Sequence, residues 1–230
     1  MAWEVPKIWE GGDVWILGGG PSVTKQFNIP EKVVQNVITG TSPLSAYSPY
    51  MKAIHDKHVI GINVAYLIGD WIDMVFFGDS GFFLSHAAGL AAFPGLKVSC
   101  HSGVSKYHWV KFTPRDRRHN LGISSVRSMV SWNGNSGSAA ISLAVHTGAK
   151  RIFLLGFDMK MSGEKQHWHD VYKRIGNQSK KRMIKLPFHR HLVGFAQIAK
   201  DAGKMGVEII NVCPDSMIPQ FRKVNLKDCL

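Results

Sequence analysis

Residues 135–158 read Asn-Ser-Gly-Ser-Ala-Ala-Ile-Ser-Leu-Ala-Val-His-Thr-Gly-Ala-Lys-Arg-Ile-Phe-Leu-Leu-Gly-Phe-Asp, which predicts a helix followed directly by a strand. The Ala-rich stretch Ser138–Thr147 favours a helix, and Gly148 closes it because glycine readily adopts the left-handed conformation at a helix end. Arg151–Gly156 is a short apolar run stopped by glycine, which is typical of a buried strand. The stretch therefore predicts one unit of an alternating α/β fold.

Strands of the same kind are predicted on both sides of this unit, at Asp13–Gly18, His58–Asn63, Ile72–Gly78, Leu96–Cys100 and Val207–Val212. A short helix follows the first strand, and a longer one runs from Pro187 to about Ala202. Ile38–Tyr50 is rich in Ser, Thr, Gly and Pro and predicts a loop. Strands that alternate with helices predict a mainly parallel sheet. We expect a single Rossmann-like α/β domain over residues 1–230, with helices flanking the sheet.

The composition is that of a globular protein, with 45% hydrophobic and 19% charged residues. No apolar run approaches the length of about 18 residues that a membrane span requires. Residues 1–4 lack the basic start and apolar stretch of a secretion signal. The three cysteines are too far apart for a zinc pattern or a disulfide framework, and free thiols fit a reducing compartment (Cys100, Cys213 and Cys229). We therefore expect a cytoplasmic protein.

The charge is strongly positive, with 28 Lys and Arg against 16 Asp and Glu and a net charge of +12. Residues 160–190 hold nine of these basic residues against Glu164 and Asp170, and the part from 160 to 186 has little periodicity, which predicts a long basic loop. A second cluster comprises Arg115, Arg117 and Arg118. Such clusters favour a polyanionic partner: nucleic acid, an anionic lipid surface or a phosphorylated ligand.

Small or polar residues follow the predicted strands, where ligands of open parallel sheets bind. The turn after the first strand allows close approach of backbone N–H groups to a phosphate or ribose, although it is neither a Walker loop nor a complete dinucleotide motif. Ser136 is a suitable N-cap for a helix whose N-terminus favours phosphate. Asp158 can bind a hydroxyl, a base or a metal, or satisfy its own turn. The candidate binding residues are Gly18, Gly19, Gly20, Ser22, Asn63, Asp79, Asn135, Ser136, Gly137 and Asp158.

Two histidine pairs, His167 with His169 and His189 with His191, are candidates for proton transfer. They form a weak zinc signature, so no metal site is predicted. His189 lies at a predicted helix start, where its pKa would be lowered, which suits a base. Alternatively, these histidines are ordinary surface residues. Three aromatic residues near basic ones are candidates for stacking on a nucleobase, although the first can equally be core (Trp132, Trp168 and Tyr172).

Four segments together resemble the bacterial sialyltransferases of the Campylobacter type: Gly18–Ser22, Asn63, Asn135–Asp158 and Val207–Ser216 with its Cys-Pro-x-Ser. The chain also resembles motility-accessory-factor-like proteins, archaeal hydroxymethylpterin pyrophosphokinases and uncharacterised phage proteins. The resemblance implies a Rossmann-like sheet, a nucleotide as leaving group and no required metal. The phage branch is the most similar in its basic loop.

Residue by residue, the resemblance implies nucleotide contacts at Asn63, at Asn135 with Ser136, and at Asp158. Gly19 and Gly78 stand where the sialyltransferases have asparagines, and Asp79 can substitute for the second. The catalytic histidine of the family falls on His189, which ranks it above His191. Lys160 stands where the family has tyrosines that contact the leaving phosphate, and a lysine can also neutralise that charge.

These observations favour an inverting, metal-independent glycosyltransferase with a nucleotide-sugar donor and no cofactor. His189, or else His167 or His169, would deprotonate the acceptor hydroxyl, while Lys160 and the helix at Ser136 stabilise the departing phosphate. Modified phage DNA would suit the basic segments as the acceptor. A pyrophosphokinase holding Mg²⁺ through Asp79 and Asp158 is one alternative, and a non-catalytic nucleic-acid-binding protein is another.

Overall fold

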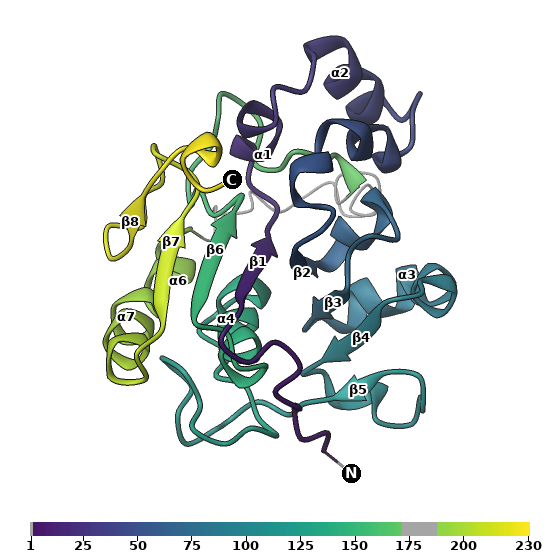
Figure 1. The fold of residues 1–230 in the computed structure, drawn as a ribbon. Helices are drawn as coiled ribbons and strands as arrows, with labels where there is room; N and C mark the ends of the chain where they lie inside the picture. Colours follow the sequence, from purple (N-terminus) through teal and green to yellow (C-terminus); the bar gives the residue numbers. More distant parts are fainter. Residues whose placement is uncertain (1, 172–187) are drawn as a thin grey trace.

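The computed structural model describes residues 2–171 and 188–230, and their strands form one parallel sheet. The strands lie side by side in the order β5-β4-β3-β2-β1-β6-β7-β8, and each neighbouring pair is parallel (Figure 1). The α/β class and the parallel sheet are thus confirmed. The strands are β1 (Asp13–Leu17), β2 (His58–Ile62), β3 (Met74–Phe77), β4 (Leu96–Ser99), β5 (Lys111–Phe112), β6 (Arg151–Leu155), β7 (Glu208–Asn211) and β8 (Arg222–Lys223).

The strand order creates a switch point at the centre of the sheet. The chain begins at β1, runs outward to β5 along one side, and then returns to β6 on the other side of β1. Leu17 pairs with Leu155, so the carboxyl ends of β1 and β6 are level with each other. Because the connections leave these two strands in opposite directions, a crevice forms beyond their carboxyl ends.

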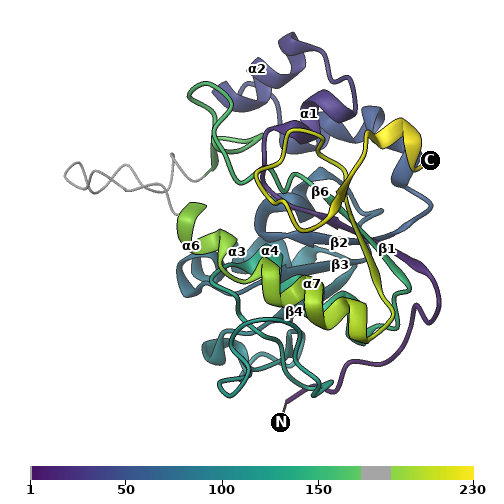
Figure 2. The same ribbon diagram turned by 90° about the vertical axis from the view of Figure 1, so that its left-hand side faces the viewer.

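Helical segments cover both faces of the sheet, as Figures 1 and 2 show. Val14 and Ile16 of β1 pack on one side with α4 and α7, whereas Trp15 and Leu17 face the opposite side, with α1, α2 and α3. This alternation follows from the two-residue period of a strand. The helices are α1 (Ser22–Gln26), α2 (Glu31–Thr39), α3 (Ser80–Ala92), α4 (Ser136–His146), α6 (Phe188–Leu192) and α7 (Phe195–Lys204), with 3₁₀ segments η1 (Leu44–Tyr50), η2 (Lys52–Ile54), η3 (Asn63–Ile68), η4 (Ser102–Val104) and η5 (Leu226–Asp228).

Three local expectations from the sequence were wrong. The predicted loop Ile38–Tyr50 contains η1, whose Tyr47 is fully buried against the sheet. The helix predicted to run from Pro187 to Ala202 is two helices, α6 and α7, with a break at Gly194. Gly194 packs closely on Asn133, because a Cβ on Gly194 would lie 2.5 Å from Oδ1 of Asn133. The strands β5 and β8 were missed because two residues leave no readable period.

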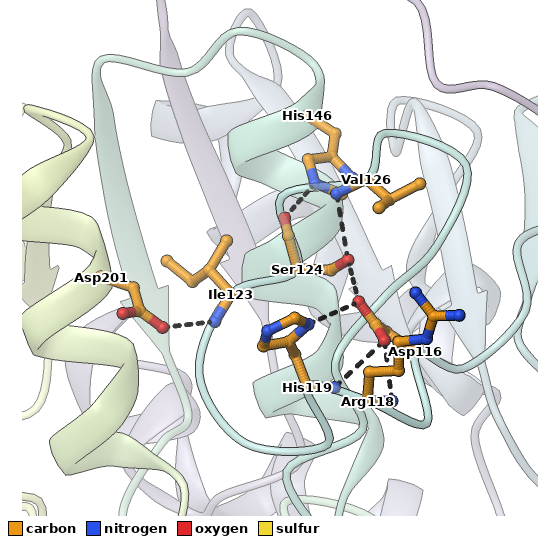
Figure 3. Close-up of polar contacts among 8 residues, drawn as sticks. All are labelled: Asp116, Arg118, His119, Ile123, Ser124, Val126, His146 and Asp201. Carbon is orange, nitrogen blue, oxygen red and sulfur yellow. Dashed lines mark hydrogen bonds and ion pairs between the residues drawn. The ribbon is translucent and has the colours of Figure 1, made fainter.

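A buried polar network fixes the loop that carries two of the predicted basic residues (Figure 3). Asp116 accepts hydrogen bonds from the backbone N–H groups of Arg118, at 3.0 Å, and His119, at 3.1 Å. Asp116 also accepts from the Ser124 hydroxyl at 2.7 Å. The Ser124 carbonyl in turn accepts from Nε2 of the buried His146 at 2.8 Å. The network therefore joins this loop to the end of α4.

We expect the free energy of unfolding to decrease as the pH falls below about 6.5. Burial lowers the pKa of His146 and of His55, His86, His167, His169 and His191, so the unfolded chain binds more protons than the folded one in this range. His146→Gln keeps a donor for the Ser124 carbonyl without titrating. Urea unfolding at pH 7.5 and 5.5 should show a smaller decrease in this variant than in wild type or in a control at the exposed His108. An equal decrease would exclude His146 as a contributor.

Candidate functional site

A cavity of about 530 Å³ lies beyond the carboxyl ends of the central strands, at the switch point between β1 and β6. Its volume is in the range of small-molecule sites, roughly 300–1,000 Å³. Nearly all the predicted binding residues line it, together with Lys160, His167 and His169, whereas Ser22 lies outside its lining. The structure therefore brings these predicted residues together around one cavity. The predicted binding residues that line it are Gly18, Gly19, Gly20, Asn63, Asp79, Asn135, Ser136, Gly137 and Asp158.

The glycine turn after β1 uses most of its N–H groups within the fold. The Gly18 N–H donates to the Leu155 carbonyl and the Gly20 N–H to the Gly156 carbonyl, both at 2.8 Å. The backbone of the turn lines the cavity, but most of its N–H groups are already hydrogen-bonded, so the turn does not offer several donors to a phosphate. Of its N–H groups, only that of Gly19 lacks a partner among the described residues.

Asp158 holds the end of this turn in place by accepting two hydrogen bonds from Ser22. Its Oδ1 accepts from the Ser22 N–H at 3.0 Å and its Oδ2 from the Ser22 hydroxyl at 2.8 Å. Burial raises the pKa of Asp158, which is 4% exposed, while the two hydrogen bonds from Ser22 act in the opposite direction. A Cβ on Gly20 would lie 1.9 Å from Oδ2. These contacts favour the interpretation of Asp158 as a turn-satisfying residue.

The start of α4 offers the best position for an anion. Asn135, rather than the predicted Ser136, is the N-cap: its Oδ1 accepts from the Ser138 N–H at 2.9 Å. Ser136 and Gly137 are the first two residues of the helix and line the cavity. N–H groups at such positions have no intrahelical partner, and the helix dipole favours negative charge beside them.

Three further polar residues from different segments line the cavity. Asn63 follows β2 with a left-handed φ of 52°, and its buried Oδ1 has no hydrogen-bond partner within residues 2–171 and 188–230. Asp79 is the exposed N-cap residue of α3. Lys160 comes two residues after Asp158 and brings a positive charge to the cavity. The cavity therefore contains acceptors, the cationic side chains of Lys160 and Arg190, and the anion position at α4.

Residues 166–169, here called the strap, pack on the glycine turn. The Trp168 indole Nε1 donates to the Gly18 carbonyl at 2.7 Å, and its backbone N–H donates to the Gly19 carbonyl at 3.1 Å. The Tyr47 hydroxyl donates to the Trp168 carbonyl at 3.1 Å. Trp168 is only 1% exposed, so it is core and the prediction that it stacks on a nucleobase was wrong.

Histidines from two segments line the cavity: His167 and His169 from the strap and His191 from α6. The first two rings are parallel, with centroids 5.2 Å apart. Burial lowers the pKa of all three, most strongly that of His169, so they are neutral at pH 7 and suited to accept protons. His189, which the sequence ranked first, is an exposed residue of α6 and is not part of the described lining.

The α6 segment also contacts the anion position. The His191 carbonyl accepts from Nδ2 of Asn135, at 3.4 Å, so His191 lies next to the start of α4. Gln166, Phe82 and Arg190 also line the cavity. Arg190 was predicted only as part of the basic segment 160–190, and the other two were not predicted. Gln166 and Arg190 are neighbours of predicted histidines, whereas nothing in the sequence distinguishes Phe82 from core residues.

The predicted basic surface is only partly supported. Arg115 is partly buried and is engaged within the fold: its guanidinium stacks on Trp132 with 3.7 Å to the ring centroid and donates to the Gly78 carbonyl at 2.9 Å. Arg117 and Arg118 are exposed. Trp132 is outside the described lining of the cavity. Within the segment 160–190, the following residues named in the predictions lie outside the described part of the chain: Tyr172, Lys173, Arg174, Lys180, Lys181, Arg182, Lys185 and Pro187.

The described residues contain neither a cluster of metal-ligand side chains nor a helix that could span a membrane. Among residues 2–171 and 188–230, no group of three or more His, Cys, Asp and Glu side chains is placed to hold a metal ion. None of the helices in this part of the chain has the length and apolar character that crossing a membrane demands.

No protein-family model matches the chain, and no curated protein sequence matches it. Solved structures do match it. The sialyltransferase CstII from Campylobacter jejuni, in complex with CMP-3FNeuAc, has 16% sequence identity and a TM-score of 0.51, over 93% of this chain and 86% of that one. The chain has the sialyltransferase fold. The monofunctional α-2,3-sialyltransferase Cst-I from the same organism has 15% identity and a TM-score of 0.52, over 93% of this chain and 80% of the other. The resemblance stated from the sequence is thus confirmed for the fold.

Proposed function

We propose that this chain is a glycosyltransferase that moves a sugar from a nucleotide-sugar donor to an acceptor hydroxyl. The observation that supports this most is the meeting, in one cavity at the switch point, of the α4 N-terminus with Lys160 and neutral histidines. The α4 N-terminus can bind a phosphate, and a neutral histidine can take a proton from an acceptor hydroxyl. Structures with the same fold are described with CMP and with CMP-3FNeuAc, so CMP-sugars are the first donors to test.

The proposed reaction needs no metal. The bond between the anomeric carbon and the phosphate oxygen breaks as the acceptor oxygen attacks from the opposite face, which inverts the configuration. The acceptor proton passes to a histidine, and the nucleotide leaves with its negative charge beside Ser136, Gly137 and Lys160. Asn63, Asp79 and the glycine turn hold the nucleoside part.

We place the base at His191 in preference to His189. Both are on α6, but only His191 lines the cavity, and its backbone contact with Asn135 brings it next to the proposed phosphate position. The bond to be broken starts at that phosphate, so the attacking hydroxyl must lie nearby. His167 and His169 belong to the strap, which packs on the glycine turn, and none of the hydrogen bonds described for the strap reaches the start of α4.

The test is nucleotide release from CMP-, UDP-, GDP- and ADP-sugars with a set of acceptors, in the presence and absence of EDTA. We expect release from one donor class, unaffected by EDTA and raised by the right acceptor. Strict dependence on Mg²⁺ together with ATP turnover would instead identify a pyrophosphokinase. For that alternative the engagement of Asp158 with Ser22 is unfavourable, because a metal would compete for its oxygens. Absence of both nucleotide binding and turnover would exclude the proposal.

We further propose that the acceptor is anionic, with hydroxymethylated DNA in the cytoplasm of a phage-infected cell as the specific candidate. Lys160 and Arg190 line the cavity, and Arg117 and Arg118 are exposed on a loop held by Asp116. Affinity for such DNA should fall steeply with salt concentration. Transfer to hydroxymethylated but not unmodified DNA would support this acceptor. Transfer only to uncharged sugars, independent of salt, would exclude it.

A further inference from the structure

A second hollow lies outside the cavity, between residues 118–125 of the loop after β5 and residues 197–205 of α7 and its end, and is here called the α7 groove. Its volume is about 630 Å³. The Ser124 carbonyl of this loop accepts from His146, the last residue of α4, whereas Ser136, the first residue of α4, lines the cavity. Because α4 has 11 residues and is therefore roughly 16 Å long, the groove and the cavity are separate sites.

The loop that forms one wall of the groove is held in place by hydrogen bonds within the fold. Asp116 holds its first part, as described above. The Asn133 amide pairs with the backbone of Gly122, accepting from its N–H at 2.6 Å and donating to its carbonyl at 2.8 Å. Asp201 of α7 reaches across to the loop and accepts from the Ile123 N–H at 3.1 Å (Figure 3). The wall is thus formed before a ligand arrives, so binding loses little conformational entropy.

Cationic side chains stand on both walls of the groove. Arg118 on the loop and Lys204 on α7 are exposed, and neither makes an ion pair within residues 2–171 and 188–230. Arg117 and Lys200, which is one helical turn before Lys204, are also exposed and extend the positive charge beyond the groove. The acid in the lining is Asp201, and both of its oxygens accept hydrogen bonds within the fold. The groove and its edges therefore present more positive than negative charge.

The form of the groove favours an extended ligand over a compact one. Most of its lining residues are exposed, so the groove is shallow, whereas small-molecule sites bury most of their ligand. Part of the lining is apolar: Ile123 is buried, and Leu121 and Met205 are 43% and 42% exposed. A polyanion with flat, accessible apolar faces matches this combination. Single-stranded nucleic acid has both features, because its phosphates repeat along the strand and its bases are not enclosed in a duplex.

We infer that the α7 groove is a second binding site, which holds a single strand of nucleic acid with phosphates between Arg118 and Lys204 and a base against Leu121 and Met205. The inference goes beyond the proposed function, because it requires no sugar transfer and uses none of the residues that line the cavity.

Fluorescence anisotropy with a labelled oligothymidine of about 12 nucleotides tests the inference, and this probe lacks the hydroxymethyl group of the proposed acceptor. Arg118→Gln and Lys204→Gln should each weaken binding about fourfold at physiological salt and reduce the slope of log affinity against log salt by about 0.7, the value of one phosphate contact. Lys227→Gln is the matched control. Lys227 is exposed and follows Leu226, which packs on the face of the sheet opposite α7, so its replacement should change neither quantity appreciably.

Leu121→Ser separates contacts to bases from contacts to phosphates. It should weaken binding of the oligothymidine about fourfold, the value of roughly one buried methylene group, and leave the salt slope unchanged because no charge is removed. Thermal unfolding of each variant checks that it is folded. A duplex of the same length should bind more weakly than the single strand, since its bases cannot reach the apolar lining.

The possible failures are distinguishable. No measurable binding of oligothymidine, or equal losses in Arg118→Gln, Lys204→Gln and Lys227→Gln, overturns the inference and leaves the proposed function standing, since nucleotide release from sugar donors is measured without nucleic acid. Duplex binding as tight as that of the single strand overturns the assignment to a single strand. Equally strong competition by a polyglutamate peptide identifies an acidic peptide as the ligand instead. Absence of sugar transfer overturns the proposed function and leaves the α7 groove untouched.

Discussion

Replacing His191 with alanine should lower the rate constant of sugar transfer by about 10²- to 10⁴-fold, the usual contribution of a positioned general base. The side chain lines the cavity, burial lowers its pKa so that it is neutral at pH 7, and its backbone touches Asn135 at the proposed phosphate position. Donor binding should change little, because the base meets the acceptor rather than the nucleotide. Single-turnover rates and nucleotide affinity, measured on the same protein, separate the two effects.

His189→Ala is the direct comparison for His191→Ala. Both residues are on the same short helix and carry the same side chain, but His189 is exposed and outside the described lining of the cavity. If His189→Ala loses more rate than His191→Ala, the base is His189, as the family resemblance implied, and our placement of the base at His191 is wrong. If the rate falls in neither variant, proton transfer does not involve α6 at all.

The sequence predicted the sheet well because each central strand is a short apolar run that stops at a small or polar residue. Asp13–Leu17 and Arg151–Leu155 have this pattern, and their burial on both faces explains why it is readable. The same reasoning located the cavity, since the carboxyl ends of parallel strands meet at one edge of the sheet. Asn63 was predicted in this way, from its position after a strand, whereas Ser136 was predicted as the N-cap of a helix; both line the cavity.

The roles of individual residues were harder to predict, because they depend on contacts between distant parts of the chain. Nothing near Asp158 in the sequence shows that Ser22 engages both of its oxygens. Similarly, the bond from Trp168 to Gly18 turns an apparent stacking residue into a core one. His189 and His191 are only two positions apart, and the choice between them depends on how α6 lies against α4, which no local pattern records.

Gly20→Ala should be the most destabilising small substitution near the site. The added Cβ would lie 1.9 Å from Oδ2 of Asp158 and 2.6 Å from the Gly156 carbonyl oxygen, and neither atom can move without breaking a hydrogen bond to the turn. Overpacking of this kind costs about 3 kcal/mol of unfolding free energy. For a chain of this size, that corresponds to a decrease of roughly 6–12 °C in the unfolding temperature.

Gly203→Ala separates this clash from any general effect of replacing glycine. Gly203 is an exposed residue of α7, and a Cβ there would meet nothing within 4 Å, so the substitution should stabilise the protein by about 0.5–1 kcal/mol. The two variants should therefore shift the unfolding temperature in opposite directions. Nucleotide affinity should fall only in Gly20→Ala, because displacing Asp158 releases Ser22 and with it the turn on which His167 rests. If Gly20→Ala unfolds like wild type, the tie between Asp158 and Ser22 is not what holds the turn.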